Sequence, residues 1–261
     1  TDMVRRRYLR FVKGGAGIIW FEACAVSPDS KSNPYQMMLH DGNVGEFQKL
    51  LSEMDKKSKV PTFKVLQLTH SGRVSKDDSW NPIPVSPKKY SGDNSKYASD
   101  ELIENIVQDH IHAAILAADA GFDAVVVKVC HGYFLSELLS AFDREGKYGG
   151  SFENRTRAIF EIVDGIRNVV GDKIGIAVRL NAFDSKPYPD GYGITKAEGK
   201  IRADLTETIR LCELLREKGV KLINISASSP ECHLFGDEPI DSKYKKYVSS
   251  CDLLMAIKIL K

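Results

Sequence analysis

The chain has 261 residues, which is enough for one α/β barrel or for two smaller domains. Its 37 basic and 35 acidic residues are interspersed and leave a net charge of +2, so the composition favours neither a nucleic-acid partner nor a membrane partner. The five cysteines form no Cys-x-x-Cys pair, which argues against a zinc site and a disulfide framework and favours a reducing, cytoplasmic setting.

Helical and strand-like patterns alternate along the chain. In order, the patterns predict a helix at 3–12, a strand at 17–26, a helix at 47–54, a strand at 61–68, a helix at 100–120, a strand at 122–129, a helix at 151–170, a strand at 174–180, a helix at 204–218 and a strand at 222–226. We expect a further helix at the end of the chain, up to Lys261. Such alternation predicts right-handed βαβ units and a parallel sheet, which either a doubly wound sheet or a (β/α)8 barrel would satisfy.

The segment 69–99 interrupts this alternation. It is polar, contains three prolines and has no periodicity. Because plain connections in compact domains are short, a segment of this length is predicted to be an active-site loop.

Three side chains that can donate or accept protons lie at the end of the buried strand at 122–129. Lys128, His131 and Tyr133 arrive together where this strand ends, and the carboxyl ends of parallel strands are where barrels and open α/β sheets place reactive groups. Taken alone, His131 would be interpreted as a structural histidine, and Lys128 could equally pair with a carboxylate such as Glu22. Cys130 is interpreted as a packing residue in the barrel wall, on the side opposite to its neighbours.

Five motifs in order give these residues a context. They lie at residues 15–23 (Gly-Ala-Gly-Ile-Ile with Glu-Ala), 67–73 (Gln-Leu-Thr-His-Ser-Gly-Arg), 131–135 (His-Gly-Tyr-Phe-Leu), 148–157 (Tyr-Gly-Gly-Ser-Phe-Glu-Asn-Arg-Thr-Arg) and 178–180 (Val-Arg-Leu). Together they resemble the Old Yellow Enzyme family of FMN-dependent NAD(P)H:flavin oxidoreductases, which includes enoate reductases and 2,4-dienoyl-CoA reductase-like proteins. The resemblance extends over nearly the whole chain.

The resemblance implies a fold. The family fold is an FMN-binding (β/α)8 TIM barrel, and on this mapping the strands correspond to the second through the sixth of the barrel. The first strand and the last two have no counterpart, so residues 1–261 are expected to form a single, partial barrel domain. We expect these residues alone to bind FMN poorly, because the missing strands would supply the phosphate contacts.

The resemblance also implies a cofactor site for FMN, with NADH or NADPH as reductant. Gln67 would hydrogen-bond the pyrimidine edge of the flavin, and Ala23 would meet the ring through its backbone. Arg179 would lie beside the pyrimidine end, where a fixed guanidinium stabilises the negative charge that gathers on reduction.

Three residues would act on the substrate. Tyr133 matches the tyrosine that protonates the substrate carbon, a role that suits a phenol because it is a neutral donor at pH 7. His131 would hydrogen-bond the carbonyl oxygen of an activated alkene. Lys128 stands where the family normally has histidine, and its ammonium is better matched to a carboxylate or an enolate.

The remaining conspicuous residues are predicted to be structural. His70 and Arg73 would hold the loop after the second strand. In the segment 148–157, the glycines would permit a tight turn, Ser151 would cap a helix, and Arg155 would tie that helix to neighbouring loops.

Three functions follow. The first is reduction of the C=C bond of a carbonyl- or carboxylate-conjugated alkene with NAD(P)H through FMN. The second is a Schiff-base lyase on a barrel, with Lys128 as the amine and Tyr133 as the proton shuttle. The third is an inactive barrel fragment. The expected partner is a small-molecule substrate, with no metal; a homo-oligomer is left open.

Overall fold

The structure is a computed structural model that describes residues 2–76, 81–86, 97–184, 186–195 and 202–227, and the backbone of 256–259. The strands are β1 (Ile18–Ala25), β2 (Phe63–Thr69), β3 (Ala124–Val129), β4 (Gly175–Asn181), β5 (Leu222–Ser226) and β6 (Ala256–Ile259). The helices are α1 (Asp2–Lys13), α2 (Val44–Lys57), α3 (Asp100–Ala120), α4 (Phe134–Leu139), α5 (Phe152–Val170) and α6 (Thr206–Glu217). Short 3-10 turns lie at Pro28–Ser30, Asp41–Asn43, Gly72–Val74 and Gly171–Lys173.

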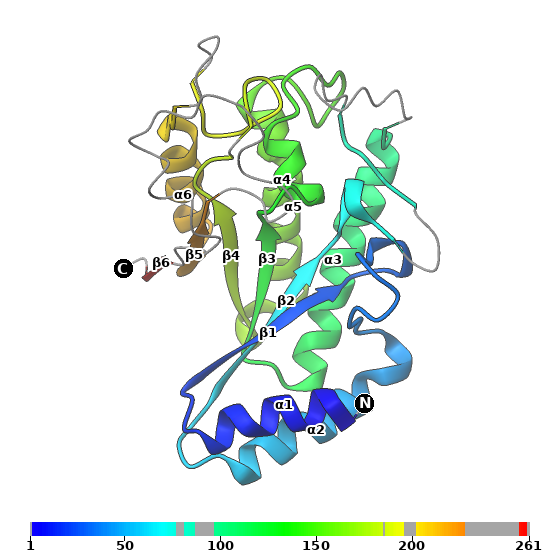
Figure 1. The fold of residues 1–261 in the computed structure, drawn as a ribbon, viewed down its shortest axis with the longest axis vertical. Helices are drawn as coiled ribbons and strands as arrows, with labels where there is room; N and C mark the ends of the chain where they lie inside the picture. Colours follow the sequence, from blue (N-terminus) through cyan, green and yellow to red (C-terminus); the bar gives the residue numbers. More distant parts are fainter. Residues whose placement is uncertain are drawn as a thin grey trace, which may run out of the picture.

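The strands form one sheet in the order β1-β2-β3-β4-β5-β6. The first five strands are parallel to one another, as the alternation of helices and strands predicts. Their carboxyl ends therefore meet at one end of the sheet, where the connecting loops and α4 also gather (Figure 1). This arrangement brings together side chains from distant parts of the sequence.

The prediction of a helix at the end of the chain is wrong for residues 256–259. These residues form β6, which pairs antiparallel with β5. An antiparallel edge strand is common on an otherwise parallel sheet, and its backbone groups satisfy the hydrogen-bonding edge of β5. In the described part of the chain, β1 and β6 are the two edge strands.

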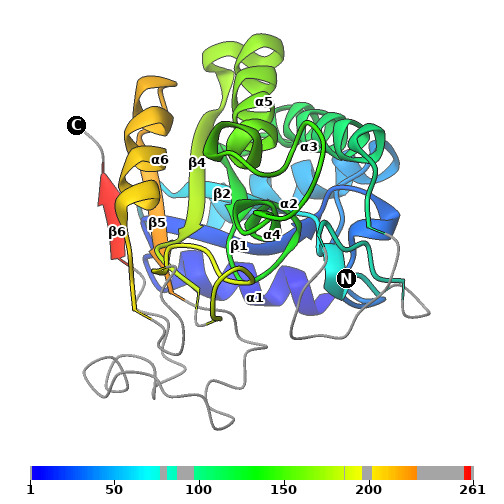
Figure 2. The same cartoon turned by 90° about the horizontal axis from the view of Figure 1, so that it is seen from above.

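The two faces of the sheet differ. One face packs against α1, α2, α3, α5 and α6 through a large apolar core, and Figure 2 shows these helices around the outside of the strands. The other face carries a much smaller apolar cluster, composed of Val65, Ala124, Val126 and Ala177 with Trp20 and Leu222 at its margin. The face with the smaller cluster is therefore the one that can carry polar side chains toward the carboxyl ends of the strands.

Local signals fix the helix that supports β3. The Ser99 hydroxyl accepts the Leu102 N–H at the start of α3, and Gly121 ends it with a left-handed φ of 94°. A hydroxyl N-cap and a left-handed glycine are strong end signals, which explains why the predicted and observed bounds of this helix agree.

No helix in the described ranges is long and apolar enough to cross a membrane.

Candidate active site

Polar side chains continue the small apolar cluster toward the carboxyl ends of the strands. Side chains in a strand alternate between faces, so Gln67, Lys128 and Arg179 lie on the same face as Val65, Val126 and Ala177. The register pairs Lys128 with Arg179, and Arg179 in turn with Asn224 of β5. Two cationic side chains thus emerge side by side from neighbouring strands.

A tight turn after β3 directs Tyr133 back toward this face. His131 and Gly132 both have left-handed backbones, with φ of 68° and 70°. Such a conformation is unfavourable for histidine, and strain of this kind concentrates at functional sites. As a result, the Lys128 Nζ lies 3.3 Å from the centroid of the Tyr133 ring, a close cation–π contact.

His131 is held neutral in this turn. Its side chain is buried, and burial together with the charges of Lys128 and Arg179 lowers the pKa of His131 to about 3. At neutral pH, His131 therefore offers one N–H donor and one ring-nitrogen acceptor, while the positive charge at the site belongs to the lysine and the arginine.

The three residues predicted to contact FMN also meet here. The Arg179 Nη1 donates to the Gln67 Oε1 over 3.3 Å, and Gln67 is paired in register with Ala23 of β1. A register shift interrupts the pairing of β1 with β2 immediately before Ala23, whose carbonyl accepts the Gln36 Nε2. Irregularities of this kind often lie beside active sites because they redirect the backbone.

Cys130 is fully buried, as its interpretation as a packing residue predicts, and it continues the alternation of β3 on the same face as Lys128. Burial raises the pKa of the Cys130 thiol, but the charges of Lys128 and Arg179 act on it in the opposite sense, and Ser226 bonds to it. Cys130 therefore belongs to the polar group of this face, while its raised pKa argues against a nucleophile. Glu22, considered as a partner for Lys128, accepts hydrogen bonds from Arg7 and Tyr8 of α1.

Asn224 is a site residue that the sequence reasoning missed. It is buried on β5 in register with Arg179. The signal is present in the strand, because Asn224 and Ser226 are polar at alternate positions between apolar neighbours. Ser226 donates to the Asn181 Oδ1 over 2.8 Å, so the polar row extends to the last residues of β4 and β5.

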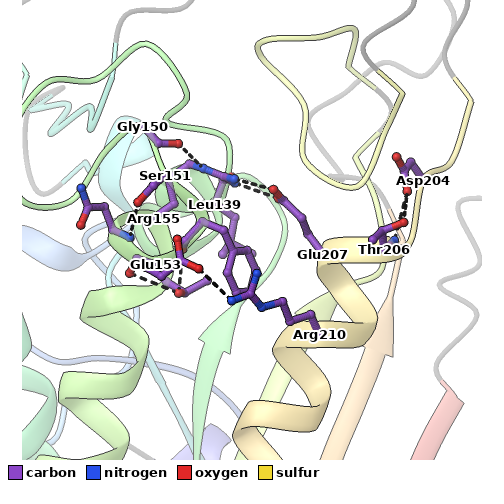
Figure 3. Close-up of polar contacts among 12 residues, drawn as sticks. Leu139, Gly150, Ser151, Glu153, Arg155, Asp204, Thr206, Glu207 and Arg210 are labelled. Carbon is purple, nitrogen blue, oxygen red and sulfur yellow. Dashed lines mark hydrogen bonds and ion pairs between the residues drawn. The ribbon is translucent and has the colours of Figure 1, made fainter.

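The supporting role of the segment 148–157 is confirmed, as Figure 3 shows. The Ser151 hydroxyl accepts the Asn154 N–H at the start of α5. Arg155 donates to the carbonyls of Leu139 and Gly150 and pairs with Glu207 of α6. The end of α4 is thereby joined to α5 and α6.

The predicted active-site loop is described in part, since residues 77–80 and 87–96 lie outside the described ranges. The structural prediction for its first residues is confirmed. The His70 Nδ1 accepts the Gly72 N–H over 3.0 Å, and the Arg73 Nη2 donates to the Ser86 carbonyl over 2.6 Å.

Known proteins are similar to this chain in sequence and in fold. Residues 3–249 match the sequence profile of the NADH:flavin oxidoreductase / NADH oxidase family. An NADPH dehydrogenase of Clostridium acetobutylicum is 33% identical over 193 residues, which cover 71% of this chain and 54% of the relative. An NADPH dehydrogenase of Bacillus subtilis is 28% identical over 235 residues, covering 88% of this chain and 64% of the relative. The chain thus spans about half to two thirds of the length of these curated relatives.

Solved structures agree with this assignment. A 2-naphthoyl-CoA reductase in complex with 2-naphthoyl-CoA superposes with a TM-score of 0.73 at 25% identity, covering 88% of this chain and 36% of that one. The Old Yellow Enzyme of Pichia sp. AKU4542 gives a TM-score of 0.67 at 26% identity, covering 84% and 59%. The predicted barrel fold and the predicted resemblance to Old Yellow Enzyme are confirmed, and the chain belongs to the NADH:flavin oxidoreductase / NADH oxidase family.

Proposed function

We propose that this chain forms the catalytic face of an FMN-dependent reductase that uses NAD(P)H to reduce the C=C bond of an activated alkene. The observation that carries the proposal is the group of side chains at the carboxyl ends of β3 and β4. There the Lys128 ammonium lies 3.3 Å from the Tyr133 ring, and a neutral His131 lies in the same turn. This group combines a proton donor, a hydrogen-bond donor and a fixed positive charge.

The residues on β1, β2 and β4 fit FMN. Gln67 offers an amide donor and an acceptor, and Arg179 is held against it over 3.3 Å. An amide beside a guanidinium matches the carbonyls and N–H of a pyrimidine ring, and the guanidinium stabilises negative charge there. Ala23, on the neighbouring strand, would present its backbone. When bound, FMN supplies hydride transfer between NAD(P)H and the substrate.

The residues of the turn after β3 would act on the substrate. The alkene gains a hydride at its β-carbon, for which NAD(P)H is the reductant, and a proton at its α-carbon from the Tyr133 hydroxyl, which solvent then reprotonates. His131 would donate a hydrogen bond to the carbonyl oxygen that carries negative charge during this addition. Its low pKa keeps it neutral, so that the charge of the site does not change across the physiological range.

Lys128 selects the substrate within this scheme. It is buried and paired in register with Arg179, so an anion that enters the face would meet two positive charges. We therefore propose carboxylate-conjugated alkenes as the preferred class. An unsaturated acid should be reduced with a higher kcat/KM than its methyl ester, and Lys128→Met should remove or reverse this preference. Equal rates for the acid and the ester in both proteins would refute the assignment.

The test of the reaction uses the intact protein that contains this chain. It should be yellow, bleach anaerobically with NADH or NADPH, and recover its colour when an activated alkene is added. Tyr133→Phe should bleach normally but recover slowly, because only the proton donor is lost. A colourless protein that stays colourless with added FMN would refute the proposal.

Two further points complete the proposal. Membership of a flavin oxidoreductase family favours this reaction over the Schiff-base lyase, for which borohydride would trap a substrate adduct on Lys128. A reducing compartment such as the cytoplasm is proposed from the sequence, in which the five cysteines are scattered and form no Cys-x-x-Cys pair.

A further inference from the structure

The loop after β2 and the turn that carries Tyr133 are packed together through their backbones. The Phe134 N–H donates to the His70 carbonyl over 3.2 Å. Gly72, with φ of 62°, approaches so closely that a Cβ there would lie 2.9 Å from the N and Cα of Phe134. The rings of His70 and Phe134 are 4.8 Å apart. The residue that follows Tyr133 is therefore fixed by the loop after β2.

One carboxylate on α4 completes this junction. The Glu137 side chain is 3% exposed, and its Oε1 accepts the Arg73 Nη2 over 2.7 Å. The same oxygen accepts the backbone N–H groups of Val85 and Ser86 over 3.1 and 3.2 Å. Because these bonds are charge-assisted and shielded from water, Glu137 has a single well-defined position.

Glu137 is linked in turn to Tyr133. Its backbone N–H donates to the Tyr133 carbonyl over 2.8 Å, in the first turn of α4, for which Tyr133 is the N-cap residue. A change in the position of Glu137 is thus transmitted through one helical turn to the residue whose ring contacts Lys128. Misplacement of a reacting group by about 1 Å can slow a reaction roughly 100-fold.

We propose that Arg73 and Glu137 are positioning residues that set the place of the Tyr133 hydroxyl during proton transfer. The inference rests on the function proposed above. It assigns a role to the Gln67–Arg73 motif beyond its contact with the cofactor, since one end of that motif would contact FMN and the other would orient the proton donor. Neither Arg73 nor Glu137 is required to touch the substrate.

The experiment separates the two halves of the reaction in the intact FMN-loaded protein. Glu137→Gln and Arg73→Met should leave the rate of flavin reduction by NAD(P)H within about twofold of the unmodified protein. They should slow reoxidation by the alkene roughly 10- to 100-fold, as expected when a proton donor is displaced. Arg73→Lys, which retains the charge but lacks the planar guanidinium, should recover part of the rate.

Asp55→Asn is the matched control. Asp55 pairs with the buried Lys64 over 2.7 Å at the opposite end of β2, so this variant also breaks one ion pair but does so far from α4. It should change neither half-reaction. The inference is overturned if the Arg73 and Glu137 variants reoxidise as fast as Asp55→Asn, or if both halves slow equally. Failure of the proposed function is a different result, in which the unmodified protein does not reduce alkenes at all.

Discussion

Replacing Arg155 by methionine should destabilise the protein far more than the same change at Arg210. Both arginines connect α5 with α6, and both lie over an aromatic ring, Phe142 for Arg155 at 4.2 Å and Phe152 for Arg210 at 4.7 Å. They differ in burial. The Arg155 side chain is 2% exposed, whereas the Arg210 side chain is 57% exposed and its partner Glu153 60%.

The expected magnitude follows from what each substitution leaves behind. Arg155→Met leaves the buried Leu139 carbonyl without its donor, at a cost of about 1–3 kcal/mol. Gly150 is an exposed residue and the Glu207 side chain is 37% exposed, so we expect both to regain water and their lost bonds to add only about 1 kcal/mol. We therefore expect a total loss of about 2–4 kcal/mol. Arg210→Met breaks an exposed pair and should cost less than about 1 kcal/mol.

Urea unfolding followed by circular dichroism measures the difference. The midpoint should fall markedly for Arg155→Met and slightly for Arg210→Met, with the slope of the transition unchanged in both. Both substitutions keep an apolar stem over the ring and both remove a guanidinium from it, so the comparison tests the other polar contacts. Equal midpoints for the two variants would show that the buried contacts of Arg155 contribute no more than a surface ion pair.

Three further predictions use the same structure. Burial holds the pKa of His70 and of His131 at about 3, below the ordinary value of 6.5, so the unfolded chain binds more protons between these values. The free energy of unfolding should then fall as the pH drops from 6.5 toward 3, by up to about 1.4 kcal/mol per pH unit for each histidine, and a urea midpoint independent of pH would contradict this. Gly72→Ala should cost at least about 2 kcal/mol, whereas Gly121→Ala, at a left-handed φ of 94° with open space around it, should cost about 1 kcal/mol; equal losses by thermal melting would exclude the close approach to α4. Arg179→Met should weaken FMN binding to the intact protein by about tenfold or more in a fluorescence titration, and unchanged affinity would remove Arg179 from the cofactor site.

Local sequence signals determine much of this fold. The helix α3 is predictable to the residue because Ser99, the apolar stripe and Gly121 specify its start, its buried face and its end. The strand β3 is predictable because it contains a continuous run of apolar, mostly β-branched residues, which is typical of a strand that is buried on both faces. The supporting role of Arg155 follows from its place in a recognisable motif, although its partners do not.

The pairing of strands depends on contacts between distant residues. The sequence predicts a helix at residues 256–259, but these residues form a strand because they pair with the free edge of β5. The sequence within 256–259 carries no information about that edge. The place of Asn224 beside this site is unpredictable for a related reason. Its importance comes from the register that places it beside Arg179, and register is a property of two strands rather than of one.

Periodicity and motif order are local properties, so they predict the parallel α/β architecture and single out the candidate reactive residues. How these residues act on one another depends on the tertiary structure. The contact of Lys128 with Tyr133 requires the left-handed turn at His131, and the low pKa of His131 requires burial and the charge of Arg179 from the neighbouring strand. Electrostatic effects depend on distance and solvent exposure, and both are set when the strands align.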